Sequence, residues 1–387
     1  MIWLALALGC EEPDPCLVPA EEEVGDDGAA IELEADVGRI EARVLRPSVA
    51  LAGQPVMVQV FGAWSAEPQS ESSGVVPEGV VVVRPALAGA DWGDGLDDRR
   101  GPLGRAAVAA ALRYAAGVDH DAAGCRLVDR APAADPDRVV LFGMSNGGNV
   151  AFATLADAAL DVPEPVGMLT WETPAGPQFV NHEFAGDDAL YAAGSCELDE
   201  HAAIQCALPS VGFGQSSGVR CFDLDGDGAC EGETPLVGTI DPASELRALS
   251  PRLLAAAEVA GVGALGWATP EDSERFWSER DAALASAAVV SRFPGLPFMI
   301  LASETDHAIP ELEDHPHVFG LGEALQRAGA AWVRLNPGSA ASGLGDENEA
   351  NATLSLAAGE GWLLPDEDES PLSESVRWAV NELVALP

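Results

Sequence analysis

The chain has 387 residues, and 48% of them are hydrophobic, which is enough for a sizeable core. A chain of this length predicts one large domain with an insertion. There are 63 acidic residues against 20 basic ones, all of them arginine, and the formal net charge is −43. Because phosphate backbones repel a chain of this charge, nucleic acid is excluded as a partner.

The N-terminal stretch "MIWLALALGC" is apolar and ends in a small residue followed by Cys10. It resembles the signal segment of bacterial lipoproteins, although it lacks the basic residues that usually come first. The resemblance implies a signal segment at 1–9 and a lipidated Cys10 that opens an acidic tether over 10–28. We therefore expect a cell-envelope protein, at the periplasmic or outer surface, or a secreted one. Its membrane contact would be through the lipid anchor alone, since the apolar run is too short to span a bilayer.

The cysteine count also favours export. Apart from Cys10 there are six cysteines, an even number: residues 16, 125, 196, 206, 221 and 230. Pairs Cys196–Cys206 and Cys221–Cys230 would close short loops and leave Cys16 to pair with Cys125. Six cysteines can pair in fifteen ways, so the other fourteen sets of pairs stay open.

In chain order, residues 29–47 alternate apolar and polar positions around Val37-Gly38, which predicts an antiparallel hairpin. Near-continuous apolar runs at 54–64 and 79–87 are typical of strands buried on both faces. A long Ala- and Leu-rich helix is expected within 96–118. The pattern then predicts a strand at 138–142, a helix over about 146–160 and a strand at 166–171.

The region 173–292 interrupts this alternation and is expected to be an insertion. It carries four cysteines and two predicted helices, at 242–261 and 270–290. The remaining predicted elements are a strand at 295–303, a helix at 319–329, a strand at 330–337, a Gly- and acid-rich loop at 338–370 and a closing helix at 373–386. Alternating strands and helices predict an α/β fold with a doubly wound, mostly parallel sheet, formed by 29–172 and 293–387.

The sequence "DRVVLFGMSNGGNV" places Gly143-Met144-Ser145-Asn146-Gly147 between a buried strand and a helix. This is the G-x-S-x-G pattern in the context that it needs, because the sharp turn holds the serine hydroxyl out from the sheet and leaves no room for side chains at the glycines. Here the chain resembles the α/β-hydrolase superfamily, in particular its prolyl-oligopeptidase and dienelactone-hydrolase-like branches. The resemblance implies that Ser145 is a nucleophile.

The same resemblance implies an oxyanion hole made of two backbone N–H groups. One belongs to Asn146, and the other to Ala63 or Trp64 in "FGAWS". It also implies an acid after the strand that follows the insertion, where Asp306 fits and Glu304 is a near neighbour. Glu172 in "LTWETP" is an alternative, because some family members carry the acid one strand earlier.

The histidine is the largest departure from the family, which places it after the last strand. Here no histidine follows residues 330–337; the six histidines are residues 120, 182, 201, 307, 315 and 317. A displaced His317 or His315 from "EDHPH" could serve as the base, because a triad is defined by geometry and not by chain order. His182 is a weaker candidate for the base. Asp346 is a still weaker candidate, as a loop carboxylate that takes over part of the function of the base. "HPH" with nearby carboxylates could instead hold a divalent metal.

The insertion contains "CFDLDGDGACEGETP", in which Asp223, Asp225 and Asp227 alternate and Gly228 follows. Alternating carboxylates on a turn converge on one hard cation, which predicts a structural Ca²⁺ site. The twelfth position of an EF-hand loop would be Thr234, so Glu231 and Glu233 are the expected substitutes for its bidentate glutamate.

Taken together, these features predict an exported serine hydrolase that cleaves a small carboxylic ester or, as second choice, a peptide. The alternative is a catalytically degenerate hydrolase-fold lipoprotein that binds and does not cleave, which the missing late histidine favours.

Overall fold

The structure is a computed structural model that describes residues 16, 28–36, 38–47, 51–62, 77–87, 97–175, 268–301, 316–335 and 370–387, together with the backbone of six short strands between 197 and 248. The predicted residues Ala63, Trp64, Asp306 and His315 lie outside this part of the chain, as do Cys10 and the Ca²⁺ ligands apart from the backbone of Asp223.

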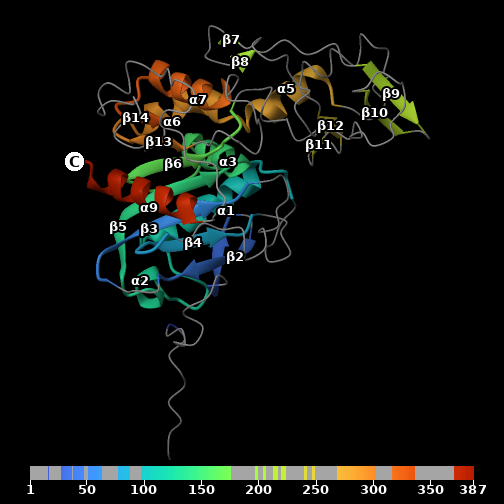
Figure 1. Ribbon diagram of the computed structural model, residues 1–387. Helices are drawn as coiled ribbons and strands as arrows, with labels where there is room; N and C mark the ends of the chain where they lie inside the picture. The colour runs from blue at the N-terminus through green and yellow to red at the C-terminus, as the bar shows by residue number, and fades with distance from the viewer. Residues whose placement is uncertain are drawn as a thin grey trace, which may run out of the picture.

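An eight-stranded sheet forms the centre of the molecule, with strand order β1-β2-β4-β3-β5-β6-β13-β14 (Figure 1). β2 pairs antiparallel with β1 and with β4, and every other neighbouring pair is parallel. This confirms the predicted doubly wound, mostly parallel sheet. The strands are β1 (Ala29–Ala35), β2 (Gly38–Leu45), β3 (Gln54–Val60), β4 (Val81–Pro85), β5 (Ala134–Met144), β6 (Gly167–Trp171), β13 (Phe298–Leu301) and β14 (Val333–Leu335).

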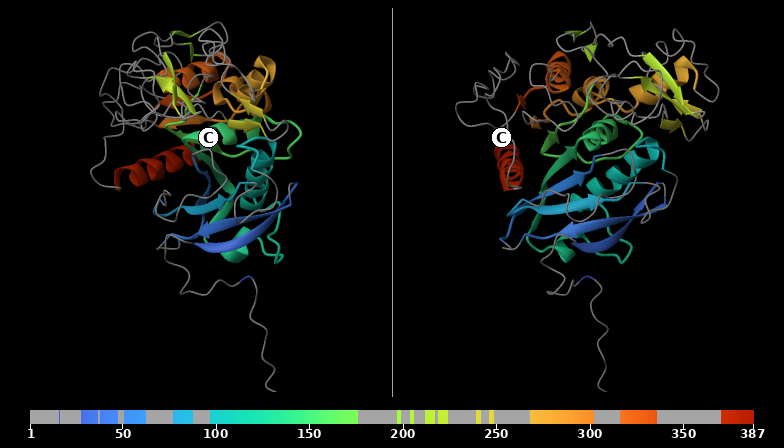
Figure 2. Two further views of the ribbon diagram at one scale, coloured as in Figure 1. Left: turned by 90° about the vertical axis from the view of Figure 1, so that its right-hand side faces the viewer. Right: turned by 45° about the vertical axis from the view of Figure 1, so that its right-hand side comes forward.

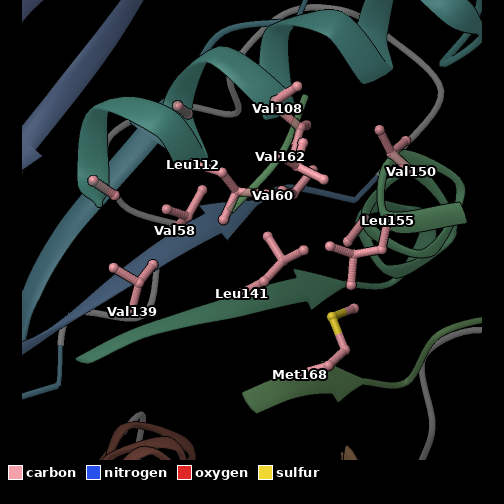
Figure 3. Packing of buried hydrophobic residues seen from close by; sticks show 14 of the residues in the cluster. Val58, Val60, Val108, Leu112, Val139, Leu141, Val150, Leu155, Val162 and Met168 are labelled. Carbon is pink, nitrogen blue, oxygen red and sulfur yellow. The ribbon is translucent and has the colours of Figure 1, made fainter. Parts of the chain in front are cut away.

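Helices cover both faces of this sheet, and α9 lies on the face opposite α1 (Figure 2). Alternate strand residues therefore enter two separate apolar clusters, because successive side chains of a strand point to opposite faces. Val58, Leu141 and Met168 pack in one cluster with α1 and α3 (Figure 3). Met57 and Phe142 pack in the other with α9. The helices are α1 (Pro102–Ala115), α2 (Leu127–Arg130), α3 (Asn146–Ala156), α5 (Pro270–Ser278), α6 (Ala282–Arg292), α7 (Pro316–Arg327) and α9 (Ser370–Ala385).

The predicted pattern of elements is largely confirmed, with two differences in the insertion. The single helix expected over 270–290 is two helices: α5 ends at Ser278, and Asp281 caps the start of α6, where its side chain accepts a hydrogen bond from the N–H of Ala283. Within the helix expected at 242–261, residues Leu246–Ala248 form the strand β12, which pairs with β11 (Thr239–Asp241). The insertion also contains β7 (Glu197–Leu198), β8 (Ile204–Gln205), β9 (Gly212–Ser216) and β10 (Val219–Asp223).

Cys16 and Cys125 form a disulfide across a sequence separation of 109 residues, which is the pairing that remains when the other four cysteines close two short loops. Cys125 is fully buried, and its N–H donates to the carboxylate of Asp121. The same carboxylate forms an ion pair with Arg130 in α2. The disulfide therefore fixes Cys16 to a buried corner beside α2.

In the part of the chain that the structure describes, no helix has both the length and the hydropathy to cross a membrane.

Candidate active site

Ser145 stands between the end of β5 and the first residue of α3, with φ 48° and ψ −131°. A non-glycine residue rarely has positive φ, and this conformation costs of the order of 1–3 kcal/mol. It is held on both sides: the N–H of Ser145 donates to the carbonyl of Trp171 at 2.8 Å, and its carbonyl accepts from the N–H of Gly148 at 2.9 Å. The structure thus confirms the sharp strand-to-helix turn that the G-x-S-x-G pattern predicts.

The glycines around Ser145 are required by close backbone approach. A Cβ at Gly143 would collide with the backbone of Gly148. A Cβ at Gly147 would collide with the carbonyls of Val60 and Phe61 at the end of β3. The turn therefore packs closely against its own helix and the neighbouring strand, which explains why glycines stand two residues before and two residues after the serine.

A buried amide ties the first turn of α3 to the returning end of the insertion. Asn149 is 2% exposed, and its Nδ2 donates to Oδ1 of Asn146 at 3.1 Å and to the carbonyl of Pro174 at 2.9 Å. Its Oδ1 accepts from the N–H of Ala282, the first residue of α6, at 2.9 Å. Asn149 thereby holds three separate segments around the turn.

Glu172 lies directly after β6, on the strand next to β5. The register pairs Met144 with Trp171, so Glu172 and Ser145 occupy equivalent positions at the carboxyl ends of adjacent strands. Glu172 is 1% exposed and has φ 45°. Its N–H donates to the carbonyl of Leu301 in β13 at 2.8 Å. A second strained residue, with a buried carboxyl group, therefore stands beside the serine.

The segment that follows β3 also reaches Ser145. A Cβ placed on Gly62 would lie 2.7 Å from Cβ and 3.3 Å from Oγ of Ser145. Ala63 and Trp64, the predicted oxyanion donors, come directly after Gly62. The described part of this segment thus brings the chain to the side of Ser145 where the prediction requires it, while Asn146 follows the serine at the start of α3.

Two buried arginines that sequence reasoning missed bind backbone carbonyls here: Arg100 those of this segment, and Arg280 those of the loop that carries Arg100. Arg100 is 4% exposed and donates from Nη1 to the carbonyl of Phe61 and from Nη2 to that of Gly62. Arg280, between α5 and α6, donates to the carbonyls of Asp98 and Arg99 at 2.8 Å each. The charge run "DDRRG" directly before an apolar helix contains Arg100 but does not indicate its contacts, and Arg280 lies outside that run.

The remaining predicted residues are only partly placed. His317 lies in the first turn of α7, and its side chain is outside the described residues. Within the described residues, no group of three or more histidine, cysteine, aspartate or glutamate side chains could hold a metal ion.

A separate cavity of about 530 Å³ opens at the amino ends of the strands. It is lined by the segments before β6 and β13, by Trp332 before β14, and by the end of α9. Ser145 lies at the carboxyl end of β5, so this cavity belongs to the opposite end of the sheet.

No family model matches the sequence, and no curated protein matches it. Among solved structures, the chain is similar to a thermostable esterase from Pseudomonas putida, with 14% identity, 94% of this chain and 85% of that chain covered, and a TM-score of 0.46. It is similar to carboxyl esterase 2 from Tuber melanosporum, with 12% identity, coverage of 84% and 78%, and a TM-score of 0.43. It is also similar to an acylaminoacyl peptidase from Pyrococcus horikoshii, with 11% identity, coverage of 79% and a TM-score of 0.41.

The chain spans 36% of the length of the acylaminoacyl peptidase. The fold itself is of the α/β-hydrolase type: a mostly parallel eight-stranded sheet, helices on both faces, and a strained serine on a glycine-lined turn after a central strand.

Proposed function

We propose that the chain is an exported serine hydrolase that cleaves a small carboxylic ester, with a peptide as second choice. One observation carries the proposal: Ser145 is held at φ 48° on a sharp turn. The glycines around it allow the backbone at the end of β3 to approach the turn closely. Backbone strain of this kind persists only where the surroundings enforce it, and it clusters at active sites.

In the proposed reaction, Oγ of Ser145 attacks the carbonyl carbon of the ester, and its proton passes to a histidine, His317 or His315. The N–H of Asn146 and an N–H of Ala63 or Trp64 hold the oxyanion. The histidine then protonates the leaving alcohol. Water, activated by the same histidine, releases the acid from the acyl-enzyme and restores Ser145.

Two carboxylates compete for the role of orienting the histidine. Asp306 follows β13 in the sequence and is favoured by the resemblance. Glu172 is supported by its buried position beside Ser145 and its strained backbone. Asp306→Asn and Glu172→Gln, compared side by side for kcat on p-nitrophenyl acetate, separate the two, because loss of the triad acid lowers kcat by about 10⁴-fold in the best-studied case.

Labelling with a fluorophosphonate probe tests the enzyme proposal. Wild-type protein with Ca²⁺ present should be labelled, and Ser145→Ala should not. The non-catalytic alternative, a binding protein on a hydrolase scaffold, is favoured by the absence of histidine after residue 335 of the sequence. Folded wild-type protein that fails to react would support that alternative, and His317→Ala and His315→Ala would identify the base if it does react.

We also propose that residues 1–9 are a signal segment, that Cys10 carries a lipid anchor, and that Asp223, Asp225, Asp227, Glu231 and Glu233 hold a structural Ca²⁺. The Cys16–Cys125 disulfide supports export, because disulfides persist in oxidising compartments. Incorporation of an alkyne-labelled fatty acid by wild-type protein, and none by Cys10→Ser, tests the anchor.

A further inference from the structure

The charged side chain of Arg100 is buried beside Phe61 and Gly62, the segment after β3 that lies close to Ser145. Its side chain is buried, and the two nitrogens of its guanidinium fork donate to two consecutive carbonyls, those of Phe61 and Gly62. Gly62 is the residue whose Cβ, if present, would contact Ser145. The guanidinium therefore holds the backbone at Phe61 and Gly62, where the segment after β3 comes close to Ser145.

Holding a carbonyl also fixes the direction of an N–H. A peptide unit is planar and trans, so its N–H points away from its own carbonyl oxygen. The carbonyl of Gly62 shares its peptide unit with the next N–H along the chain, one of the two donors proposed for the oxyanion hole. By binding the carbonyl of Gly62, Arg100 thus constrains the orientation of the N–H on the other side of the same peptide unit. A rigid planar fork can fix two adjacent peptide planes at once, whereas the single ammonium of a lysine cannot.

Arg100 is itself held in an unfavourable backbone conformation. Arg99 has φ 51° and Arg100 has φ 63°, in the left-handed region that residues other than glycine rarely adopt. Arg280 grips the carbonyls of Asp98 and Arg99, and its guanidinium lies 3.6 Å from the centre of the Phe276 ring. The loop that carries Arg100 is therefore fixed by a second buried guanidinium.

The first turn of α1 closes the same loop. The carboxylate of Asp98 accepts hydrogen bonds from the N–H groups of Gly101 at 2.9 Å and Leu103 at 2.6 Å. Arg280 and Asp98 thus fix the backbone that carries Arg100, and the Arg100 side chain extends from it to the end of β3.

We propose that Arg100 is a positioning residue of the oxyanion hole, which aims the N–H that follows Gly62 at the developing negative charge, with Arg280 as its support. The inference rests on the proposed hydrolase function and deepens it. It predicts that Arg100 acts on the transition state, and that its positive charge alone is not sufficient.

The test compares Arg100→Lys with the matched control Arg292→Lys. Arg292 also holds backbone carbonyls with its fork, those of Asp157 and Leu160 at 2.6 Å each, but at the far end of α3 from Ser145. We would measure kcat and KM for p-nitrophenyl acetate, the affinity for an alkyl trifluoromethyl ketone that mimics the tetrahedral intermediate, and thermal unfolding.

Arg100→Lys should lower kcat by about 10- to 100-fold, since loss of one oxyanion donor costs about 10²- to 10³-fold. The affinity for the ketone should fall in parallel while KM stays near the wild-type value. Arg292→Lys should keep the wild-type kcat and ketone affinity, even where its melting temperature falls.

Wild-type kcat and ketone affinity in folded Arg100→Lys would overturn the inference, as would equal losses in Arg292→Lys. If Arg100→Lys does not fold, Arg280→Lys decides: the same selective loss of kcat supports the inference, and a wild-type kcat overturns it. Wild-type protein that neither reacts with the fluorophosphonate nor hydrolyses the ester contradicts the proposed function itself, so the two failures are distinguishable.

Discussion

Gly62 and Ser145 are so close that a single methyl group on Gly62 would lie 2.7 Å from the Cβ of the serine. The two residues belong to segments that follow adjacent parallel strands, β3 and β5. This contact joins the proposed nucleophile to the segment proposed to hold its oxyanion, and it leads to the first prediction.

Gly62→Ala should reduce the rate of fluorophosphonate labelling of Ser145 by at least about tenfold, because the added methyl must displace the serine or the segment after β3. Gly295→Ala is the control, since a Cβ there has no heavy atom within 4 Å. Equal labelling of the two variants would contradict the prediction.

Asn149→Ala should lower the free energy of unfolding by about 2–4 kcal/mol, measured by urea denaturation. The substitution leaves the carbonyl of Pro174 and the N–H of Ala282 without this partner in the interior, and each buried polar group so stranded costs about 1–3 kcal/mol. Asn381→Ala, on an exposed position of α9, should change stability by less than about 0.5 kcal/mol. Similar values for the two variants would show that the Asn149 contacts are dispensable.

Tyr114→Phe should remove an alkaline loss of stability. Burial, with a smaller contribution from the charge of Asp121, raises the pKa of Tyr114 well above its ordinary value of 10.0. The folded state therefore keeps a proton that the unfolded chain releases as pH rises through about 10, so wild-type protein loses stability above that pH. Below it the contribution is fully present.

The measurement for Tyr114 is the urea midpoint of both proteins at pH 7 and pH 11. Among the described side chains, the hydroxyl of Tyr114 makes no hydrogen bond, so Tyr114→Phe should be equal to or more stable than wild type at pH 7. From pH 7 to pH 11 the urea midpoint of wild type should fall further than that of Tyr114→Phe. An equal fall in the two proteins would refute the raised pKa of Tyr114. Tyr191, the other tyrosine of the sequence, is present in both proteins.

The double variant Cys16→Ala/Cys125→Ala should lose about 2–4 kcal/mol of stability in urea. A crosslink across 109 residues restricts the unfolded chain by roughly 4–5 kcal/mol in the chain-entropy treatment, and measured effects are usually smaller. Urea denaturation without reductant checks the value. A double variant as stable as wild type would mean that this crosslink adds nothing to the buried corner around Asp121.

Ca²⁺ should raise the melting temperature of wild-type protein relative to protein in EGTA. Ligand at one hundred times its dissociation constant stabilises by about 2.7 kcal/mol. Asp225→Asn/Asp227→Asn should lose the shift, and Mg²⁺ should not reproduce it, since it demands a smaller octahedral site. An equal rise in melting temperature in the double variant would show that Ca²⁺ binds elsewhere than at Asp225 and Asp227.

Periodicity was sufficient to predict the sheet, because each buried strand and each apolar helix face leaves its own local pattern, and the turn at Ser145 was predicted by its glycines. The guanidinium contacts were not predictable. Arg280 reaches residues more than 180 positions away in the sequence, and a charged residue in a loop looks exposed until the fold is known. The break between α5 and α6 was missed because Asp281 is a cap, which interrupts no hydrophobic pattern.

The Cys16–Cys125 crosslink lies beside α2, which directly precedes β5, whereas Ser145 follows the other end of that strand (Figure 1). β5 has 11 residues, so roughly 35 Å separate the two ends. The crosslink therefore holds Cys16 near the opposite end of β5 from the serine. One end of this strand is thus fixed by a covalent crosslink, and the other by the strained turn at the serine.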